Sequence, residues 1–284
     1  MLILNAVSDP VEQLPPLREI IADNDLRATK ALGQNFLCDL NLTRKIARQA
    51  GITPSDHVIE IGPGPGGLTR GLLLEGARRM TAIEFDERAI RALQSLKAAA
   101  ASRLDLVHGD ALKKEMLEFG SDNHRKIVAN LPYNIATPLL IGWLRDIHGK
   151  GEAAYQSITV MVQKEVAERM AARDNTKPYG RLSVLCQWLC DCRICFDVPA
   201  SAFVPPPKVT SAIIQLTPKH RSDTIEFSIM ENLTENAFGQ RRKMIRQTLK
   251  AYLPILEDLG IDTTLRAENL SVSQFIQLAE AHSQ

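Results

Sequence analysis

The sequence predicts an open, doubly wound α/β sheet, mostly parallel, followed by a small all-helical domain. Two observations predict this class. Between residues 57 and 172, short apolar runs of strand length alternate with longer segments of helical periodicity, the pattern of parallel strands joined by crossover helices. After residue 226 the strand pattern stops, and apolar residues recur only at helical spacing.

Seven strands are expected, because seven apolar or alternating runs are bounded by turn residues. They are residues 57–61, 80–85, 104–108, 127–129, 157–162, 193–198 and 209–216. The last two are joined by a proline-rich loop at 204–208, and such a hairpin-like pair would close one side of the parallel sheet. Helices are expected where apolar residues repeat every three or four positions. They are residues 17–21, 41–50, 68–75, 87–101, 137–146, 164–172 and 181–189.

A polar stretch at residues 218–223 is typical of a linker. Beyond it, helical periodicity predicts helices at 227–238, 238–252 and 272–281. We therefore divide the chain into an N-terminal extension (1–28), an α/β domain (29–218) and a helical domain (219–284).

Bulk composition excludes several classes. The 284 residues are 45% hydrophobic and 24% charged, as in ordinary globular proteins, and no apolar run approaches the ~20 residues of a membrane span. A net charge of +1 argues against a protein that coats nucleic acid. Five cysteines, an odd number, favour a reducing compartment, and the N-terminus makes a poor signal peptide. We expect a cytoplasmic monomer without membrane association.

The most informative motif is Asn130-Leu131-Pro132-Tyr133, directly after the apolar run 127–129. It should lie at the carboxyl end of a strand, where ligands bind in open α/β sheets. A side-chain amide and a backbone carbonyl can accept both hydrogens of an exocyclic amino group, while the aromatic ring stacks on the base. The motif indicates an enzyme that acts on a base amino group, such as adenine N6.

A glycine-rich turn follows the first predicted strand. Gly62, Gly64 and Gly67 have G-x-G-x-x-G spacing, which permits close approach of a ligand to a helix N-terminus. Glu84 ends the second strand, where a carboxylate can hold ribose hydroxyls. Nicotinamide and flavin enzymes share both features. A further interpretation is that the glycine turn and the carboxylate bind no ligand.

Asp110 separates these classes. It ends the third strand, where its carboxylate can accept a hydrogen bond from an adenine amino group, although an N-cap role is an alternative. Dehydrogenases do not need this residue together with the 130–133 motif. The combination favours S-adenosylmethionine over NAD.

Several motifs in one order carry a family resemblance. Residues 30–37 (KALGQNFL), 59–69, 109–110 and 130–135 (NLPYNI) resemble the ribosomal RNA adenine N6-dimethyltransferases. Residues 161–167 (MVQKEVA), 179–184 (YGRLSV), 203–209 (FVPPPKV) and 240–246 (QRRKMIR) are similar to the small-subunit branch of that family. The resemblance extends from about residue 28 to the end.

This resemblance implies a Rossmann-like, class I methyltransferase sheet and S-adenosylmethionine as the cofactor. The implied reaction dimethylates N6 of two adjacent adenines in the loop of the 3′-terminal hairpin of small-subunit (16S) rRNA, with a role in small-subunit biogenesis. The implied partners are this rRNA and the immature small subunit.

The resemblance also implies roles for single residues. Asn35 and Leu37 would cover the methionine end of the cofactor, and Gly62 would lie under it. Glu84 would bind the ribose, Asp110 the adenine, and Asn130 would bridge cofactor and target. The implied catalytic residues are Asn130, Leu131, Pro132, Tyr133 and Phe203, with Tyr133 and Phe203 stacking on the target adenine. A core position for Phe203, capping the sheet, is the alternative.

Basic residues near the C-terminus form a candidate RNA contact. Arg242, Arg246 and Lys250 are spaced by four in the predicted helix 238–252, and Arg241 and Lys243 lie beside them. Such a row can follow a phosphate backbone, although charged rows are often only solvated faces.

Cys186, Cys190, Cys192 and Cys195 lie in an apolar segment, so we expect core packing and no metal. Other functions stay open: a large-subunit adenine methyltransferase of the antibiotic-resistance type, a non-catalytic ribosome assembly factor, and a remote NAD enzyme. The 203–209 loop and the basic residues argue against the first, and the 130–133 motif argues against a DNA-binding role.

Overall fold

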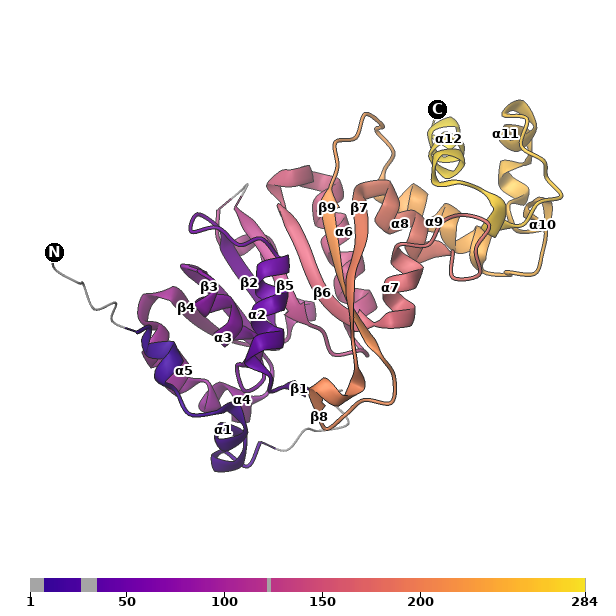
Figure 1. Ribbon diagram of the computed structural model, residues 1–284. Coiled ribbons are helices and arrows are strands. Elements are labelled where there is room, and N and C mark those ends of the chain that lie inside the picture. Colours follow the sequence, from indigo (N-terminus) through magenta and orange to yellow (C-terminus); the bar gives the residue numbers. More distant parts are fainter. Residues whose placement is uncertain (1–7, 27–34, 122–123, 284) are drawn as a thin grey trace, which may run out of the picture.

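The computed structural model describes residues 8–26, 35–121 and 124–283 (Figure 1). A seven-stranded sheet with the order β4-β3-β2-β5-β6-β9-β7 forms its centre. The strands are β2 (His57–Ile61), β3 (Arg79–Glu84), β4 (Leu104–His108), β5 (Arg125–Asn130), β6 (Ser157–Gln163), β7 (Cys190–Val198) and β9 (Ser211–Pro218). The first five are parallel, and β9 runs antiparallel to both β6 and β7. This arrangement confirms the predicted fold class.

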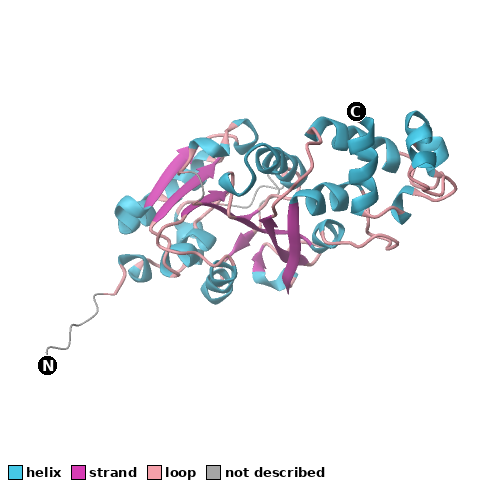
Figure 2. Cartoon of the chain, turned by 90° about the horizontal axis from the view of Figure 1, so that it is seen from above, coloured by secondary structure: helices cyan, strands magenta, loops and turns pink. Residues whose placement is uncertain are grey.

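Helices cover both faces of the sheet (Figure 2). They are α2 (Leu40–Gln49), α3 (Gly67–Leu74), α4 (Glu87–Ala92), α5 (Gln94–Ala100), α6 (Ala136–Lys150), α7 (Lys164–Met170) and α8 (Arg181–Leu189). Neighbouring strand residues enter opposite cores: Val58 and Val128 belong to one apolar cluster, Ile59 and Ile127 to another. Because side chains alternate along a strand, an apolar run can supply both clusters.

The prediction of one helix over residues 87–101 is wrong, because α4 and α5 are separated at Leu93. The ψ angle of Leu93 is −9°, which interrupts the helix. Leu93 is fully buried, and its side chain, like that of Leu96, packs close to Gly66 in the glycine-rich turn. The break therefore places two leucines beneath that turn.

A second, two-stranded sheet was not predicted. β1 (Phe36–Leu37) pairs antiparallel with β8 (Phe203–Val204), which places the end of the predicted 30–37 motif beside the start of the proline-rich loop. Both strands lie at the lower edge of the molecule in Figure 1. Residues 30–34 of the predicted motif lie outside the described residues.

Part of the N-terminal extension packs on the α/β core. It contains a short 3-10 helix (Pro10–Gln13) and α1 (Leu17–Asp23). Asp9 forms a two-pronged ion pair with Arg103 at 2.7 Å, and Arg70 of α3 donates to the Pro15 carbonyl at 2.6 Å. The segment thus contacts the helix that follows the glycine-rich turn.

The C-terminal part contains α9 (Phe227–Phe238), α10 (Ile245–Thr248), a 3-10 helix (Lys250–Tyr252), α11 (Leu253–Asp258) and α12 (Val272–His282). The predicted single helix over 238–252 is wrong. The Ile245 and Arg246 amides donate to the carbonyls of Leu265 and Thr263, which lie outside any helix through 245. Pairing with this distant segment replaces the hydrogen bonds of a continuous helix.

The C-terminal part shares an apolar cluster with the sheet. Trp188 of α8 contacts Phe227, while Phe238 packs against both Tyr179 and Phe275. In the 218–223 stretch, Asp223 accepts from the Trp188 indole and is paired with Arg221. These contacts hold the C-terminal part against α8.

None of the helices that the structure describes combines the length and apolar character needed to cross a membrane. The five cysteines are free thiols. Among the described residues, no three His, Cys, Asp or Glu side chains are grouped so that they could hold a metal ion.

Candidate active site

A pocket of about 260 Å³ opens at the carboxyl ends of β2, β3 and β5. All of the predicted cofactor positions line it: Asn35, Leu37, Gly62, Glu84, Asp110 and Asn130. Leu131, Pro132 and Tyr133 line it as well. The parallel strands end at one edge of the sheet, which brings these distant residues together.

The glycine-rich turn contributes Gly62, Gly64 and Gly67 to the lining of the pocket. Gly62, Gly64 and Gly66 have φ angles of 65°, 55° and 91°, which favour glycine. A Cβ on Gly67 would lie 2.2 Å from the Leu37 carbonyl oxygen, so β1 can lie over the start of α3 only when this residue lacks a side chain.

Glu84 is held by the backbone around it. Its two carboxylate oxygens accept from the amides of Gly64 at 3.0 Å and Asp86 at 2.8 Å. The side chain is almost fully buried, and burial raises its pKa above the usual value. A carboxylate oxygen has further acceptor capacity, so Glu84 can also receive ligand hydroxyls.

The amide of Asn130 has a defined orientation. Its Nδ2 donates to the Asn35 carbonyl at 3.2 Å, which leaves Oδ1 as the acceptor end of the group. Both residues line the pocket. The structure therefore joins the residue before β1 to the end of β5 and provides an acceptor for a ligand amino group.

The three residues after Asn130 differ in their roles. Leu131 is 1% exposed and is a core residue at the pocket edge. The Pro132 carbonyl accepts from the Ile135 amide at 3.1 Å, so this candidate acceptor already has one partner within the turn.

 The Pro132 carbonyl oxygen has two lone pairs, so it can still accept one further hydrogen bond. Tyr133 is half-buried, and its hydroxyl lies 2.7 Å from the Ser211 hydroxyl.

Asp110 serves as an N-cap and also lines the pocket. Its Oδ1 accepts from the Leu112 amide at 3.0 Å, so the alternative reading of this residue describes part of its role. Two residues that the sequence reading missed lie beside it. Phe85 and Leu112 line the pocket although 60% and 46% of their surfaces are exposed. Exposed apolar side chains around a pocket signal a ligand, but their exposure cannot be read from sequence.

Phe203 is not among the residues that line the pocket. It is 3% exposed, pairs with Leu37 across β1 and β8, and belongs to an apolar cluster beneath them. The expectation that Phe203 and Tyr133 face one pocket is therefore corrected for this conformation. The core position that the sequence left as an alternative describes it better, because pairing with β1 turns the ring inward.

Comparison with known proteins identifies the family. A sequence profile described as ribosomal RNA adenine dimethylase matches residues 26–284. The chain belongs to this family.

Close relatives of this dimethylase-family chain extend over nearly its full length. The Ribosomal RNA small subunit methyltransferase A of Chelativorans sp. (strain BNC1) is 52% identical over 272 residues, covering 95% of this chain and 98% of the relative. The protein of the same name from Azorhizobium caulinodans is 50% identical over 275 residues, covering 95% and 94%.

Two solved structures share the fold. A dimethyladenosine transferase from Plasmodium falciparum superposes with a TM-score of 0.73 and 29% identity, covering 84% of this chain and 94% of the other. The 23S rRNA methyltransferase ErmE superposes with a TM-score of 0.66 and 25% identity, covering 88% and 100%. The ribosomal RNA adenine dimethylase family uses S-adenosylmethionine as its methyl donor.

The pocket of this family member fits that cofactor. The buried Glu84 carboxylate can receive hydroxyl groups, and the glycine-rich turn lines the pocket at the start of α3. Phe85 and Leu112 offer exposed apolar surface in the pocket that Asp110 also lines, as a purine ring requires.

The predicted basic row has a different geometry in this family member. Arg242, Lys243, Arg246 and Lys250 are exposed, but the break in the predicted helix means that a spacing of four does not align them on one face. α10, which carries Arg246, lies at the upper right in Figure 1, away from β1 and β8. An RNA that contacts both regions must extend across the surface.

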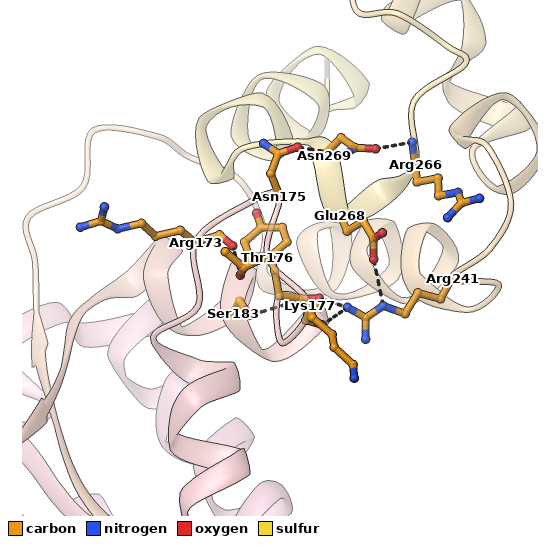
Figure 3. Close-up of polar contacts among 11 residues, drawn as sticks. Arg173, Asn175, Thr176, Lys177, Ser183, Arg241, Arg266, Glu268 and Asn269 are labelled. Atoms are coloured by element: carbon orange, nitrogen blue, oxygen red, sulfur yellow. Dashed lines mark hydrogen bonds and ion pairs between the residues drawn. The ribbon is translucent and has the colours of Figure 1, made fainter. Parts of the chain in front are cut away.

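Arg241 holds two parts of the chain together. It donates to the carbonyls of Lys177 and Tyr179 and to the Glu268 carboxylate (Figure 3). Asn175 strengthens the same junction, because its amide donates to the Glu268 carbonyl at 2.8 Å. Arg241 thus anchors the loop between α7 and α8 to the C-terminal part.

Arg241→Ala and Arg242→Ala are therefore expected to differ. The first removes three hydrogen bonds and should lower the free energy of unfolding by about 1–2 kcal/mol, measured by urea denaturation. The second should leave the free energy of unfolding unchanged. It should lower the slope of log binding constant against log salt concentration by about 1, because one phosphate contact is lost. Equal losses of stability in the two variants would contradict this division of roles.

Glu60 is a buried acid that the sequence reading did not single out. It is 1% exposed and accepts from the Thr69 hydroxyl at 2.7 Å. Burial, and then the neighbouring Glu84, raise the pKa of Glu60 to about 8 from 4.5. The acid is therefore largely protonated in the folded protein at neutral pH.

This raised pKa predicts a pH-dependent stability. Between about pH 4.5 and pH 8 the folded state holds a proton that the unfolded state releases, so stability is highest below this window and falls as pH rises through it. Glu60→Gln keeps the shape and removes the titration, so its free energy of unfolding should fall less steeply. Urea denaturation across the window tests this, and parallel curves for the two proteins would contradict it.

Proposed function

We propose that this chain transfers methyl groups from S-adenosylmethionine to N6 of two adjacent adenines in the loop of the 3′-terminal hairpin of small-subunit (16S) rRNA. Both adenines become N6,N6-dimethyladenine, and the modification contributes to small-subunit biogenesis. The observation that carries the proposal is the orientation of Asn130, which offers an acceptor oxygen at the pocket. The full-length relatives named small-subunit methyltransferase supply the substrate class.

One side of the pocket would hold the cofactor. Glu84 would accept the ribose hydroxyls, Asp110 the adenine amino group, and Phe85 and Leu112 would contact the adenine ring. Asn35, Leu37 and Gly62 would enclose the methionine end, as their place in the pocket allows. The bound cofactor supplies an activated methyl group on a sulfonium centre.

The other side would hold the target adenine. Its N6 lone pair is delocalised into the ring, which makes N6 a poor nucleophile. Hydrogen bonds from N6 to Asn130 Oδ1 and to the backbone carbonyl beside Pro132 would weaken this delocalisation, and stacking on Tyr133 would fix the ring. Alignment and local electrostatics can then provide most of the catalysis, without a dedicated general base.

Phe203 would complete the stack only if its ring left the core, which requires β8 to separate from β1. Val204 of β8 and Val209 in the loop after it are exposed apolar residues. An RNA that contacts this loop could favour such a rearrangement, since binding shifts a population toward the state it contacts.

The RNA partner would contact the exposed basic residues Arg242, Lys243, Arg246 and Lys250, while Arg241 holds their segment in place. Phosphate contacts of this kind set orientation, and the unstacked adenine supplies specificity. We propose the immature small subunit as the partner and the cytoplasm as the location, because a ribosomal subunit is the substrate. We propose a monomer as the acting form.

The test is radiolabelled methyl transfer from S-adenosylmethionine to under-methylated small subunits, large subunits and free rRNA, followed by nucleoside analysis. We expect the wild type to label small subunits as N6,N6-dimethyladenosine. Tyr133→Ala should lose this label. Label only on large subunits would contradict the proposed substrate. Tight binding to small subunits without label would instead favour a non-catalytic assembly factor.

The large-subunit alternative rests on the structural likeness to ErmE. The sequence relatives at about half identity carry the small-subunit name, and the dimethyladenosine transferase superposes with the higher TM-score. These observations favour the small-subunit substrate.

A further inference from the structure

The phenol oxygen of Tyr133 is held from outside the pocket. It lies 2.7 Å from the hydroxyl oxygen of Ser211, 78 positions later in the sequence. Ser211 is the first residue of β9, is fully buried, and does not line the pocket. A hydroxyl group from the sheet therefore reaches the far end of the ring.

Ser211 is a rigid anchor. It pairs with Gln163 of β6 on one side and with Val198 of β7 on the other, so its backbone is held from both directions. The adjacent Thr210 carbonyl also accepts from the Lys164 amide at 3.0 Å. A serine side chain has one torsion angle between this fixed backbone and its hydroxyl group, which limits how far the hydroxyl can move.

The backbone fixes the other end of Tyr133. The Leu131 amide donates to the Met161 carbonyl at 3.2 Å, and the Ile135 amide donates to the Pro132 carbonyl at 3.1 Å. A tyrosine ring has two torsion angles, and rotation about the first would break the bond to Ser211. Together these contacts define the plane of the ring beside Asn130.

We propose that Ser211 is a positioning residue for methyl transfer, acting through Tyr133, and that the second transfer depends on it more than the first. This inference rests on the proposed function, in which Tyr133 stacks on the target adenine. An unmethylated N6 has two N–H donors, but N6-methyladenine has only one. After the first transfer, fewer hydrogen bonds orient the base, so stacking must contribute a larger share of the alignment.

Loss of the anchor should therefore change the product as well as the rate. Misplacement of reacting groups by about 1 Å can lower a rate by ~10²-fold, and removal of one distant hydrogen bond should displace the ring by less. We expect Ser211→Ala to slow the second transfer by roughly tenfold and the first by a smaller factor. N6-methyladenosine would then accumulate.

The experiment compares Ser211→Ala, Tyr133→Phe, the double variant and Ser211→Thr with the wild type. Time courses of N6-methyladenosine and N6,N6-dimethyladenosine on small subunits separate the two transfers, and calorimetry measures S-adenosylmethionine affinity. The single variants should accumulate the monomethyl product with unchanged cofactor affinity. The double variant should resemble either single variant, because both remove the same bond, and Ser211→Thr should restore the wild-type ratio.

A second readout does not depend on activity. The chain has four tyrosines, so NMR of the protein with labelled tyrosine rings should show four sets of ring signals. The set that disappears in Tyr133→Phe belongs to Tyr133. Ser211→Ala should shift the Tyr133 ring-carbon signal and leave the other three unchanged.

Two outcomes would overturn the role of Ser211: an unchanged product ratio in both single variants, or effects that add fully in the double variant. A wild-type chain that does not methylate small subunits would instead contradict the proposed function. The two failures are distinguishable, because the wild type is measured in the same assay.

Discussion

Replacement of Asn130 by alanine is expected to lower kcat for methyl transfer by about 10²–10³-fold, the usual effect of removing one polar group that stabilises a transition state. The change removes the acceptor Oδ1 and also the bond from Nδ2 to the Asn35 carbonyl. Single-turnover methyl transfer to small subunits measures the effect, because it isolates chemistry from product release.

The matched control is Asn236→Ala, which removes an exposed amide from α9. It should leave kcat and stability close to those of the wild type. A kcat for Asn130→Ala within threefold of the control would contradict the assignment of Asn130 to the transferring site.

Replacement of Gly67 by alanine should remove cofactor binding and destabilise the fold by about 3–5 kcal/mol, at the upper end for a single substitution. The new Cβ would lie 2.2 Å from the Leu37 carbonyl oxygen and 3.0 Å from the Leu17 side chain. Because one of these is a backbone atom of β1, the strand that leads from Asn35 must move. Thermal unfolding with and without S-adenosylmethionine measures both effects.

Gly142→Ala on α6 is the control, because a Cβ there has no atom within 4 Å. It should be neutral or stabilising by roughly 0.5–1 kcal/mol, since alanine favours helix more than glycine does. If both variants showed the same melting temperature and the same cofactor-induced shift, the close approach of β1 to α3 would not constrain the pocket.

Much of the site was predictable because its residues are local to strand ends. Gly62, Glu84, Asp110 and Asn130 each follow an apolar run, and parallel strands bring their carboxyl ends to one edge. Periodicity predicted the strands for the same reason, because a buried strand needs apolar residues whatever its neighbours are.

Other features depended on contacts between distant segments. The helix expected over 238–252 was interrupted because the Ile245 and Arg246 amides pair with residues 263–265. Phe203 turned inward because β8 pairs with β1, about 165 positions earlier, a separation that follows from the register of Phe203 and Leu37. Arg241 was grouped with its basic neighbours, although its partners lie near Tyr179 and Glu268.

By itself the sequence determined the fold class and the residue types at the ends of the parallel strands, since these depend on apolar patterning and short-range spacing. Only the tertiary structure decided which way the Asn130 amide faces, where Phe203 lies, and that Ser211 holds Tyr133. The physical reason is that a hydrogen bond is formed by position in space, and sequence separation alone does not specify which distant groups meet.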